Sequence, residues 1–243
     1  MTVSELKHTL RKDYKYRIEL HAHTSPVSSC GAVSPEDMVE LYHQRNYHGI
    51  VVTNHFNRYN IERFPEFSKE AYIDSYLKAV DDAKKVAEKY GITVFVGAEI
   101  RFDENPNDYL LYGVDRDILS VCYDYFSKGL EAFRKEVKLP GSVLVHAHPF
   151  RNGMTRVSPE LVDGIEILNL HPGHNSSVAL STRYAYETKA KIKTAGSDFH
   201  EKLHLGCGAL LAKEMPTDTF ELVELLKSGD YLLEISGETI VLP

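Results

Sequence analysis

The chain is poor in cysteine and contains no long apolar run. Its 243 residues include three cysteines, Cys30, Cys122 and Cys207, an odd number without the spacing of a metal ribbon. Such sparse cysteines are typical of reduced thiols inside a cell. Residues 1–16 are charged and polar and lack the apolar core of a signal peptide, and no run is long enough to span a membrane. We therefore expect a cytoplasmic protein that does not contact membranes.

An excess of basic residues is also missing. The 28 Lys and Arg residues against 35 Asp and Glu residues give a formal net charge of −7. This charge argues against a nucleic-acid partner bound through a broad basic face, although a local basic pocket stays open. The sequence has no internal repeat, low-complexity tract or linker. With 43% hydrophobic residues, it fits a single domain over 1–243 with an N-terminal arm at 1–16.

Short apolar stretches alternate with amphipathic ones about seven times, which predicts a parallel α/β barrel or wound sheet. A helix start is expected at Ser34–Asp37, where an N-cap serine precedes a proline and two acids. A long helix is expected over about 71–90, closed by Gly91. Residues 117–138 are expected to form two helical pieces, and 108–114 a strand.

Several of the apolar stretches end in side chains that ligate metals. The first, Ile18–Thr24, carries His21 and His23, which share one face because residues i and i+2 of a strand point the same way. Burying so many ionisable groups without a cation would be costly. Parallel strands deliver such residues to one edge, so the sequence predicts a metal site at the C-terminal strand ends. The other stretches end in Asn54-His55, Gly97-Ala98-Glu99, His146-Ala147-His148 and Asp198-Phe199-His200.

These motifs resemble the PHP family, the polymerase and histidinol phosphatase superfamily. The resemblance implies a distorted (β/α)7 TIM-like barrel with up to three divalent ions, Zn, Mn or Fe, at the C-terminal strand ends. It also implies hydrolysis of phosphate esters. The matching motifs stand in the family order between about 17 and 212, and they are His21-Ala22-His23-Thr24, Thr53-Asn54-His55, Gly97-Ala98-Glu99, His148-Pro149-Phe150-Arg151 and Gly196-Ser197-Asp198-Phe199-His200.

The resemblance further implies three groups of metal ligands. The first group is His21, His23, Glu99 and Asp198. The second group is Glu99, His148 and Asp108, and the third is His55, His200 and Cys30. Asp108 stands where the family often has His, and Cys30 where it often has Asp or His. A thiolate is a good zinc ligand, so Cys30 is either a ligand or a loop thiol beside a weak third site. Asn54, where the family commonly has Asp, is expected to orient a ligand.

Other polar residues lie close to the same strand ends. Arg151 is expected to bind the substrate phosphate through its guanidinium group, with a surface ion pair as the alternative. His204 and His171 are candidates for protonating the leaving alkoxide. His146 shares a face with His148 but lies one layer deeper, where a core or ligand-orienting role is expected.

The predicted function is a metal-dependent phosphatase acting on a small phosphorylated metabolite, with cations lowering the pKa of the attacking water. A nuclease or phosphodiesterase is the second hypothesis, which stacking aromatics and a basic groove would favour. A low-turnover metal-binding regulatory module is the third, for which Asn54 and Cys30 are the only hints. Amidohydrolase-type deaminases also begin with His-X-His but often use a bridging lysine, where this chain has Glu99. The oligomeric state stays open.

Overall fold

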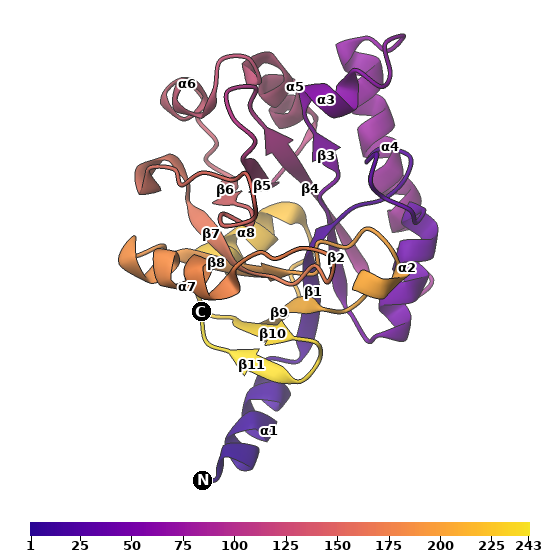
Figure 1. Ribbon diagram of the computed structural model, residues 1–243. Helices are drawn as coiled ribbons and strands as arrows, with labels where there is room; N and C mark the ends of the chain where they lie inside the picture. The colour runs from indigo at the N-terminus through magenta and orange to yellow at the C-terminus, as the bar shows by residue number, and fades with distance from the viewer.

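The computed structural model describes residues 1–243 as an α/β molecule with helices arranged around a strongly curved mixed sheet (Figure 1). The strands follow one another across the sheet in the order β11-β10-β9-β1-β2-β4-β5-β6-β7-β8, and the short β3 pairs with β4. No helix combines the length and the apolar character needed to cross a membrane.

The strands are short and mostly buried. Their bounds are β1 Tyr16–Ala22, β2 Gly49–Val52, β3 His55–Phe56, β4 Thr93–Arg101, β5 Asp108–Tyr112, β6 Val143–His146, β7 Gly164–Asn169, β8 Ile192–Gly196, β9 Gly208–Ala212, β10 Leu232–Ile235 and β11 Thr239–Val241.

Eight α-helices and two 3₁₀ turns connect the strands. Their bounds are α1 Val3–Asp13, α2 Pro35–Gln44, α3 Arg58–Ile61, α4 Lys69–Ala87, α5 Arg116–Tyr125, α6 Leu130–Glu136, η1 Pro159–Leu161, α7 Val178–Glu187, η2 Lys202–His204 and α8 Thr219–Ser228. Helix α4 packs on β4 and on α2, α7 packs on β7, and α8 lies across β4 and β5.

The sheet curls into the expected distorted barrel. Seven strands, β1, β2 and β4 to β8, run round it in chain order, and the end of β8 returns to β1. Phe199 forms a parallel bridge with Ala22 there. The N–H of His23 donates to the carbonyl of Phe199 at 2.8 Å, and the N–H of Phe199 donates to the carbonyl of His21 at 3.1 Å. The barrel therefore closes next to the His-X-His motif.

One strand runs against the expected direction. The sequence predicts parallel strands, but β5 is antiparallel to both β4 and β6, and that expectation is wrong at this place. Parallel neighbours need a crossover of a dozen or more residues, whereas only six residues separate Arg101 from Asp108. Asp108 pairs in register with Arg101, so the start of β5 lies at the same edge as the end of β4.

The expected helices form with their local signals. Ser34 Oγ accepts from the N–H of Asp37 at 3.0 Å at the start of α2, as the N-cap pattern predicts. Helix α4 buries an apolar stripe, and Gly91 follows it with φ of +64°. Residues 117–138 form the two expected pieces, α5 and α6.

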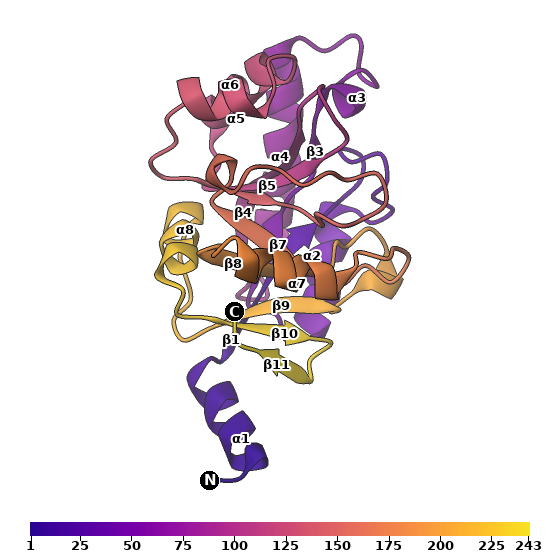
Figure 2. The ribbon, with the colours of Figure 1, turned by 60° about the vertical axis from the view of Figure 1, so that its left-hand side comes forward.

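The N-terminal helix α1 projects from the rest of the molecule in both ribbon views (Figures 1 and 2). None of its residues is buried. Arg11 attaches it by an ion pair of 2.8 Å to Glu234 of β10, and Lys7 pairs with Glu238 at 3.0 Å. Its contacts are with the antiparallel extension β9–β11, away from the strand ends that carry the metal-type residues.

Candidate metal centre

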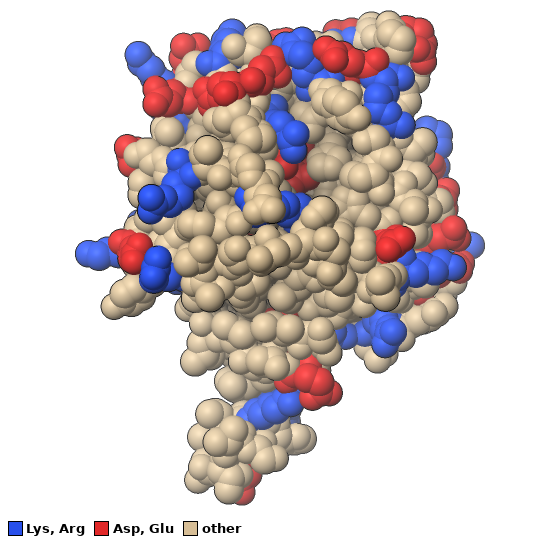
Figure 3. All heavy atoms as spheres, in the orientation of Figure 1, with Lys and Arg blue, Asp and Glu red and all other residues tan.

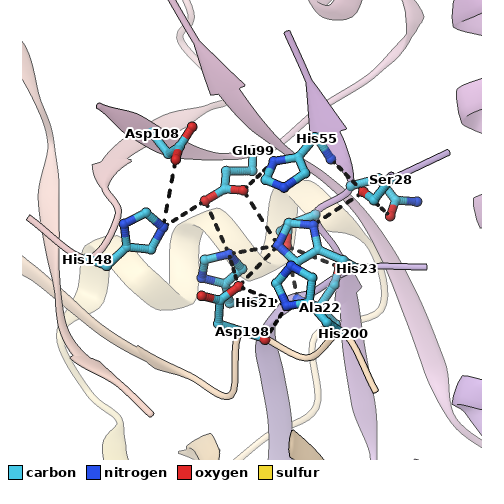
Figure 4. Close-up of polar contacts among 12 residues, drawn as sticks. His21, Ala22, His23, Ser28, His55, Glu99, Asp108, His148, Asp198 and His200 are labelled. Carbon is cyan, nitrogen blue, oxygen red and sulfur yellow. Dashed lines mark hydrogen bonds and ion pairs between the residues drawn. The ribbon is translucent and has the colours of Figure 1, made fainter. Parts of the chain in front are cut away.

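The predicted ligand residues converge at one edge of the barrel (Figure 4). Strands β1, β3 and β4, the start of β5, and the segments that follow β1, β6 and β8 each supply at least one of them. Figure 3 shows that acidic and basic side chains meet in a hollow on the face seen in Figure 1. The residues that the structure brings together are His21, His23, His55, Glu99, Asp108, His148, Asp198 and His200, with Cys30 at the margin.

His21, His23 and Asp198 form the deepest group. The Nε2 atoms of His21 and His23 are 3.1 Å apart, and each lies 3.3 Å from Oδ1 of Asp198. All three side chains are at most 2% exposed. The strand geometry expected for His-X-His therefore holds, since both imidazoles project to the same side.

Glu99 stands between four imidazoles. Its Oε1 lies 3.0 Å from Nε2 of His148 and 3.4 Å from Nε2 of His21. Its Oε2 lies 2.7 Å from Nδ1 of His55 and 3.5 Å from Nε2 of His23. A carboxylate with its two oxygens in two different groups of ring nitrogens has the placement of a bridging ligand.

Hydrogen bonds fix which nitrogen several histidines present. His21 donates from Nδ1 to Glu166 at 2.8 Å, and His200 donates from Nδ1 to the carbonyl of Asp198 at 2.7 Å. The Nδ1 of His23 lies 3.3 Å from Oγ of Ser28. That hydroxyl donates to Asn54, so its free lone pair accepts from His23. In a neutral imidazole the remaining Nε2 then carries a lone pair, so the lone pairs of His21 and His23 face each other and fit a shared cation.

The electrostatics of the group also require positive charge. Burial opposes protonation of His21, but Asp198, Glu166 and Glu99 outweigh it and raise its pKa well above the usual value. Burial likewise opposes ionisation of Asp198, but His21 and His23 hold its pKa well below the usual value. A buried cluster that keeps its carboxylates ionised and draws a proton onto an imidazole is suited to divalent cations.

One buried atom of Glu99 and one of its neighbour His55 have no hydrogen-bond partner. Nδ1 of His55 and Oε2 of Glu99 are close, but their geometry is not that of a hydrogen bond, and both remain unsatisfied. A buried polar atom without a partner costs about 1–3 kcal/mol. These atoms fit the metal that the family resemblance implies, because an ion between ligands satisfies both.

Cys30 lies in the loop after β1, beside His55 and His200. Its Sγ and ring nitrogens of His23, His55 and His200 lie within 4.8 Å of one another. Burial disfavours the thiolate, but hydrogen bonds from His200 and His55 outweigh it and lower the pKa of Cys30 to about 6. The thiol is thus placed as a ligand would be, and its ligation stays a prediction.

Asp108 reaches the site with a partner that sequence reasoning missed. Arg101 holds it in a bidentate pair, with Nε donating to Oδ1 at 2.8 Å and Nη2 donating to Oδ2 at 2.6 Å. Its Oδ2 lies 4.0 Å from Nε2 of His148. Burial and the nearby Glu99 raise the pKa of Asp108. Asp108 therefore adjoins the centre, and both of its oxygens already accept from the guanidinium group.

Further residues support the predicted ligands without having been expected. Glu166 of β7 accepts from His21 and from the N–H of His148, the second at 2.9 Å. Asn169 donates to Asp198 at 3.2 Å and to Glu166 at 3.0 Å. The only sequence signal for these two residues is an acid and an amide inside the apolar stretch Gly164–Asn169.

Asn54 is predicted to orient a ligand. In the structure its Oδ1 accepts from Ser28 Oγ at 2.9 Å, behind the ring of His23.

Arg151 lies at the margin of the same group. Its Nη2 donates to Asp198 Oδ2 at 2.5 Å and to Asn169 Oδ1 at 2.8 Å. Its side chain is 16% exposed, and its Nε is buried without a partner. Arg151 thus forms an ion pair, as the alternative expects, but this pair is mostly buried and involves a predicted metal ligand. Binding of phosphate by Arg151 stays a prediction.

A pocket of about 240 Å³ opens beside Cys30 and His200 and is lined by Cys30, Ala32, His171, His174, His200, Glu201 and His204. The rings of His171 and His204 are 4.0 Å apart. The N–H of Gly173 donates to Nδ1 of His171 at 2.9 Å, and the N–H of His200 donates to Nδ1 of His204 at 3.2 Å. In their neutral forms both rings therefore carry the proton on Nε2, opposite to the arrangement in His21 and His200.

Burial and the nearby His204 lower the pKa of His171 to about 4, against the opposing effect of Asp198. Burial also lowers the pKa of His204. His146, one layer deeper, is fully buried, stacks on Tyr109 and makes no hydrogen bond from either ring nitrogen. Its environment is that of a core residue rather than a ligand.

A larger cavity lies away from this chemistry. It has a volume of about 650 Å³ and adjoins the opposite ends of β6, β7 and β8, where Val143, Gly164 and Ile192 line it. Its lining contains no histidine or cysteine and only one acid, Asp163. A choice by volume alone would make this cavity the candidate active site, but every group of metal-type ligands lies at the other edge of the barrel.

Comparison with known proteins agrees with this geometry. A two-domain protein from Bacteroides vulgatus, described as containing a predicted PHP-like metal-dependent phosphoesterase, is similar to the chain with 18% identity and a TM-score of 0.59. The similarity covers 90% of this chain and 64% of that one. PsfC from Pseudomonas syringae is similar over 80% of each chain, with 15% identity and a TM-score of 0.55. No curated protein matches the sequence.

These two structures share the fold at identities too low to carry an activity. The model of the PHP domain family, by contrast, matches residues 19–236, from the middle of β1 to the end of β10. That span contains every residue of the candidate centre. The chain therefore belongs to the PHP domain family.

Proposed function

We propose that this protein is a metal-dependent phosphoesterase that acts as a phosphatase on a small phosphorylated metabolite. One observation carries the proposal: Glu99 and Asp198 lie among imidazoles whose Nε2 lone pairs face one another in a buried group. Such a donor set is suited to two or three divalent cations, and PHP membership makes phosphate-ester hydrolysis the chemistry to test.

The side chains that would hold the cations form three groups: His21, His23, Glu99 and Asp198; Glu99 and His148 with Asp108 beside them; and Cys30, His55 and His200. Bound cations supply Lewis acidity toward the phosphoryl oxygens and lower the pKa of water. Glu166 and Ser28 fix the rings of His21 and His23 from behind, which keeps their ligand atoms in place.

Arg151 is proposed to position the phosphate. Asp198 and Asn169 hold its Nη2, so the guanidinium group is oriented before substrate arrives. Its Nη1 makes no hydrogen bond to the protein and, unlike Nε, is not buried, so Nη1 is the donor left for a phosphoryl oxygen. A hydrogen bond from a fixed cation to an anion is among the stronger ones in proteins.

His171 and His204 are proposed to contact the substrate from the pocket beside Cys30. Each holds a proton on Nε2 because a backbone N–H occupies its Nδ1. With a pKa of about 4, His171 is neutral at pH 7, so its N–H serves better as a hydrogen-bond donor to the leaving oxygen than as a strong acid. Proton transfer from His204 or His171 stays a prediction.

The pocket lining favours a small substrate over a nucleic acid. It contains no Phe, Tyr, Lys or Arg and so offers neither a stacking platform nor a basic groove. Of the nearby aromatic residues, Phe56 is fully buried against Tyr76 and Phe64 stacks on Phe67, whereas Tyr59 and Phe67 are exposed. The lack of Lys and Arg in the pocket lining is what supports the phosphatase over the nuclease hypothesis.

The test combines metal analysis with phosphate release. Protein purified without chelator should contain two or three divalent ions per chain and release phosphate from one of a panel of sugar, amino-alcohol and nucleotide monoesters. Asp198→Asn should lower kcat/KM at least about 100-fold, because it weakens a proposed ligand. The control Asp103→Asn alters an exposed acid that pairs with Arg58 and should have no effect.

Each other outcome has a defined meaning. A protein that holds no metal after incubation with zinc and manganese would overturn the proposal. Metal-loaded protein that cleaves diesters but no monoester would replace the phosphatase with the phosphodiesterase hypothesis. Metal-loaded protein that hydrolyses no ester would favour the third hypothesis, a metal-binding regulatory module.

A further inference from the structure

The three ligand groups differ in the kind of atom they offer. Carboxylate oxygens of Glu99 and Asp198 take part in the two groups around His21 and His148. The third group is His23, Cys30, His55 and His200. Because Nε2 of His23 faces His21 and Asp198, we assign His23 to the first group. The other three residues, which we call the outer cluster, contribute one sulfur and two imidazoles and no carboxylate of their own. Manganese prefers oxygen ligands, whereas zinc accepts sulfur and nitrogen in a tetrahedral arrangement.

The loop that carries Cys30 is fastened to the rest of the centre. The N–H of Ala32 donates to the carbonyl of His200 at 2.8 Å, which ties the loop to the strand end that bears the other ligand. Gly31 packs so closely that a Cβ there would lie 2.7 Å from the carbonyl carbon of Thr24. The backbone thus keeps the thiol beside the two imidazoles.

A second observation indicates that the outer cluster has a ligand to bind. Nδ1 of His55 and Oε2 of Glu99 are buried at its inner side and have no hydrogen-bond partner. Because Nδ1 of His200 donates to the carbonyl of Asp198, its Nε2 is the atom that lies toward Cys30. Three protein ligands are also the number found in the open zinc sites of hydrolases and dehydrogenases, which keep the fourth position for water or substrate.

We infer that the outer cluster is a thiolate site that selects Zn²⁺ over Mn²⁺, so that the metal positions of this protein are not equivalent. The inference rests on the metal centre of the proposed function and concerns only which ion each position takes. The two carboxylate-containing groups accept either ion, whereas Cys30 confines the outer cluster to ions that bind sulfur well.

Cobalt spectroscopy tests the inference directly. Co²⁺ takes the place of zinc, and a thiolate bound to it gives a near-ultraviolet charge-transfer band. We expect the band in Co²⁺-loaded wild type and in the control Cys207→Ser, whose thiol lies outside every ligand group. Cys30→Ser should lose the band, and both variants should give the wild-type circular dichroism spectrum.

Metal competition gives a second readout. Protein equilibrated with equal Zn²⁺ and Mn²⁺ is analysed for both elements. Cys30→Asp, which replaces the thiolate by a carboxylate, should lower the zinc-to-manganese ratio of the outer position at least about tenfold, and Cys207→Ser should leave it unchanged. Cys30→Asp also retains a ligand, so its protein stays metal-loaded.

Two results would overturn the inference: a wild-type cobalt spectrum without a thiolate band, or a zinc-to-manganese ratio that is the same in wild type and Cys30→Asp. Phosphate release by the same samples separates it from the proposed function. Hydrolysis without a thiolate band refutes only the inference, and a thiolate band without hydrolysis of any ester refutes only the proposed activity.

Discussion

At the scale of single residues, the hydrogen bonds of each imidazole separate the proposed ligands from the proposed donors. His21 and His200 donate from Nδ1 to protein oxygens, which frees the Nε2 lone pair for a cation. His171 and His204 accept backbone N–H groups at Nδ1, which places the proton on Nε2. These four histidines at one edge of the barrel can therefore differ in role although the sequence shows the same side chain.

Removal of the Arg151 side chain should affect the substrate more than the metal. Arg151→Ala is expected to raise KM about ten- to hundredfold, because one charge-assisted hydrogen bond to phosphate is worth about 1.5–3 kcal/mol. Steady-state kinetics and metal content are measured together. Arg58→Ala, which alters an exposed arginine paired with Asp103, is the matched control. A fall in metal content at unchanged KM would show that Arg151 only supports Asp198.

His146 and His148 differ by two positions and should respond in opposite ways. His146→Phe removes two buried nitrogens that have no partner and keeps the stacking on Tyr109, so the free energy of unfolding should rise by about 1 kcal/mol. His148→Phe should instead lower the metal content. Denaturant unfolding and elemental analysis check both. Metal loss in His146→Phe would contradict the placement of His146 in the core.

The sequence predicted the ligands better than their supports. His21, His23 and Asp198 could be found because strand periodicity and strand ends place their side chains at one edge. Glu166 could not be found in this way, because a single acid within an apolar strand matches no sequence motif and its partner, His21, is 145 residues away in the chain. Arg101 was missed because its role depends on the strand β5 that pairs with it.

At the scale of elements, the direction of β5 decides what the second ligand group contains. Hydrophobic periodicity shows that a strand exists but not which way it runs. Because the turn after β4 is short, β5 returns antiparallel and brings its first residue, Asp108, to the ligand edge together with Arg101. A parallel strand would have placed Asp108 at the opposite end of the barrel.

The contact of β8 with β1 should tolerate no side chain at Gly196. A Cβ at Gly196 would lie 2.4 Å from Cβ of His21, so Gly196→Ala must push the two strands apart. We expect a loss of about 3 kcal/mol in the free energy of unfolding and a lower metal content. Gly91→Ala is the control, since Gly91 has φ of +64° and an open surrounding, and should cost about 1 kcal/mol with metal retained. Equal losses would contradict this account.

At the scale of the whole molecule, the cations are expected to be part of the stability of the fold. Three histidines and two carboxylates of the centre are buried within a few ångströms of one another, namely His21, His23, His148, Glu99 and Asp198. Apolar packing could not replace a cation there, because the effect of burial is outweighed by the neighbouring imidazoles, which hold the pKa of both Glu99 and Asp198 well below the usual value, and the two carboxylates stay ionised. Binding to the folded state alone adds about 2.7 kcal/mol per site at a hundredfold excess over Kd.

Metal removal should therefore lower the melting temperature. For a chain of this size we expect a decrease of about 5–10 °C after chelation and its recovery on adding zinc or manganese. Calorimetry with elemental analysis of the stripped sample provides the measurement. An unchanged Tm in protein shown to be metal-free would mean that the buried cluster is satisfied without ions.

The closure of the barrel and the metal centre occupy the same few residues. Across the join of β1 and the end of β8, the N–H of His23 donates to the carbonyl of Phe199 and the N–H of Phe199 donates to the carbonyl of His21. The side chains of His21, His23 and Asp198 face one another beside this join. An ion held by both sides would fasten this join, whereas an empty site would leave it to the hydrogen bonds between the two segments. The amide protons of His23 and Phe199 should thus exchange with solvent deuterium at a rate that reports how fully the centre is loaded.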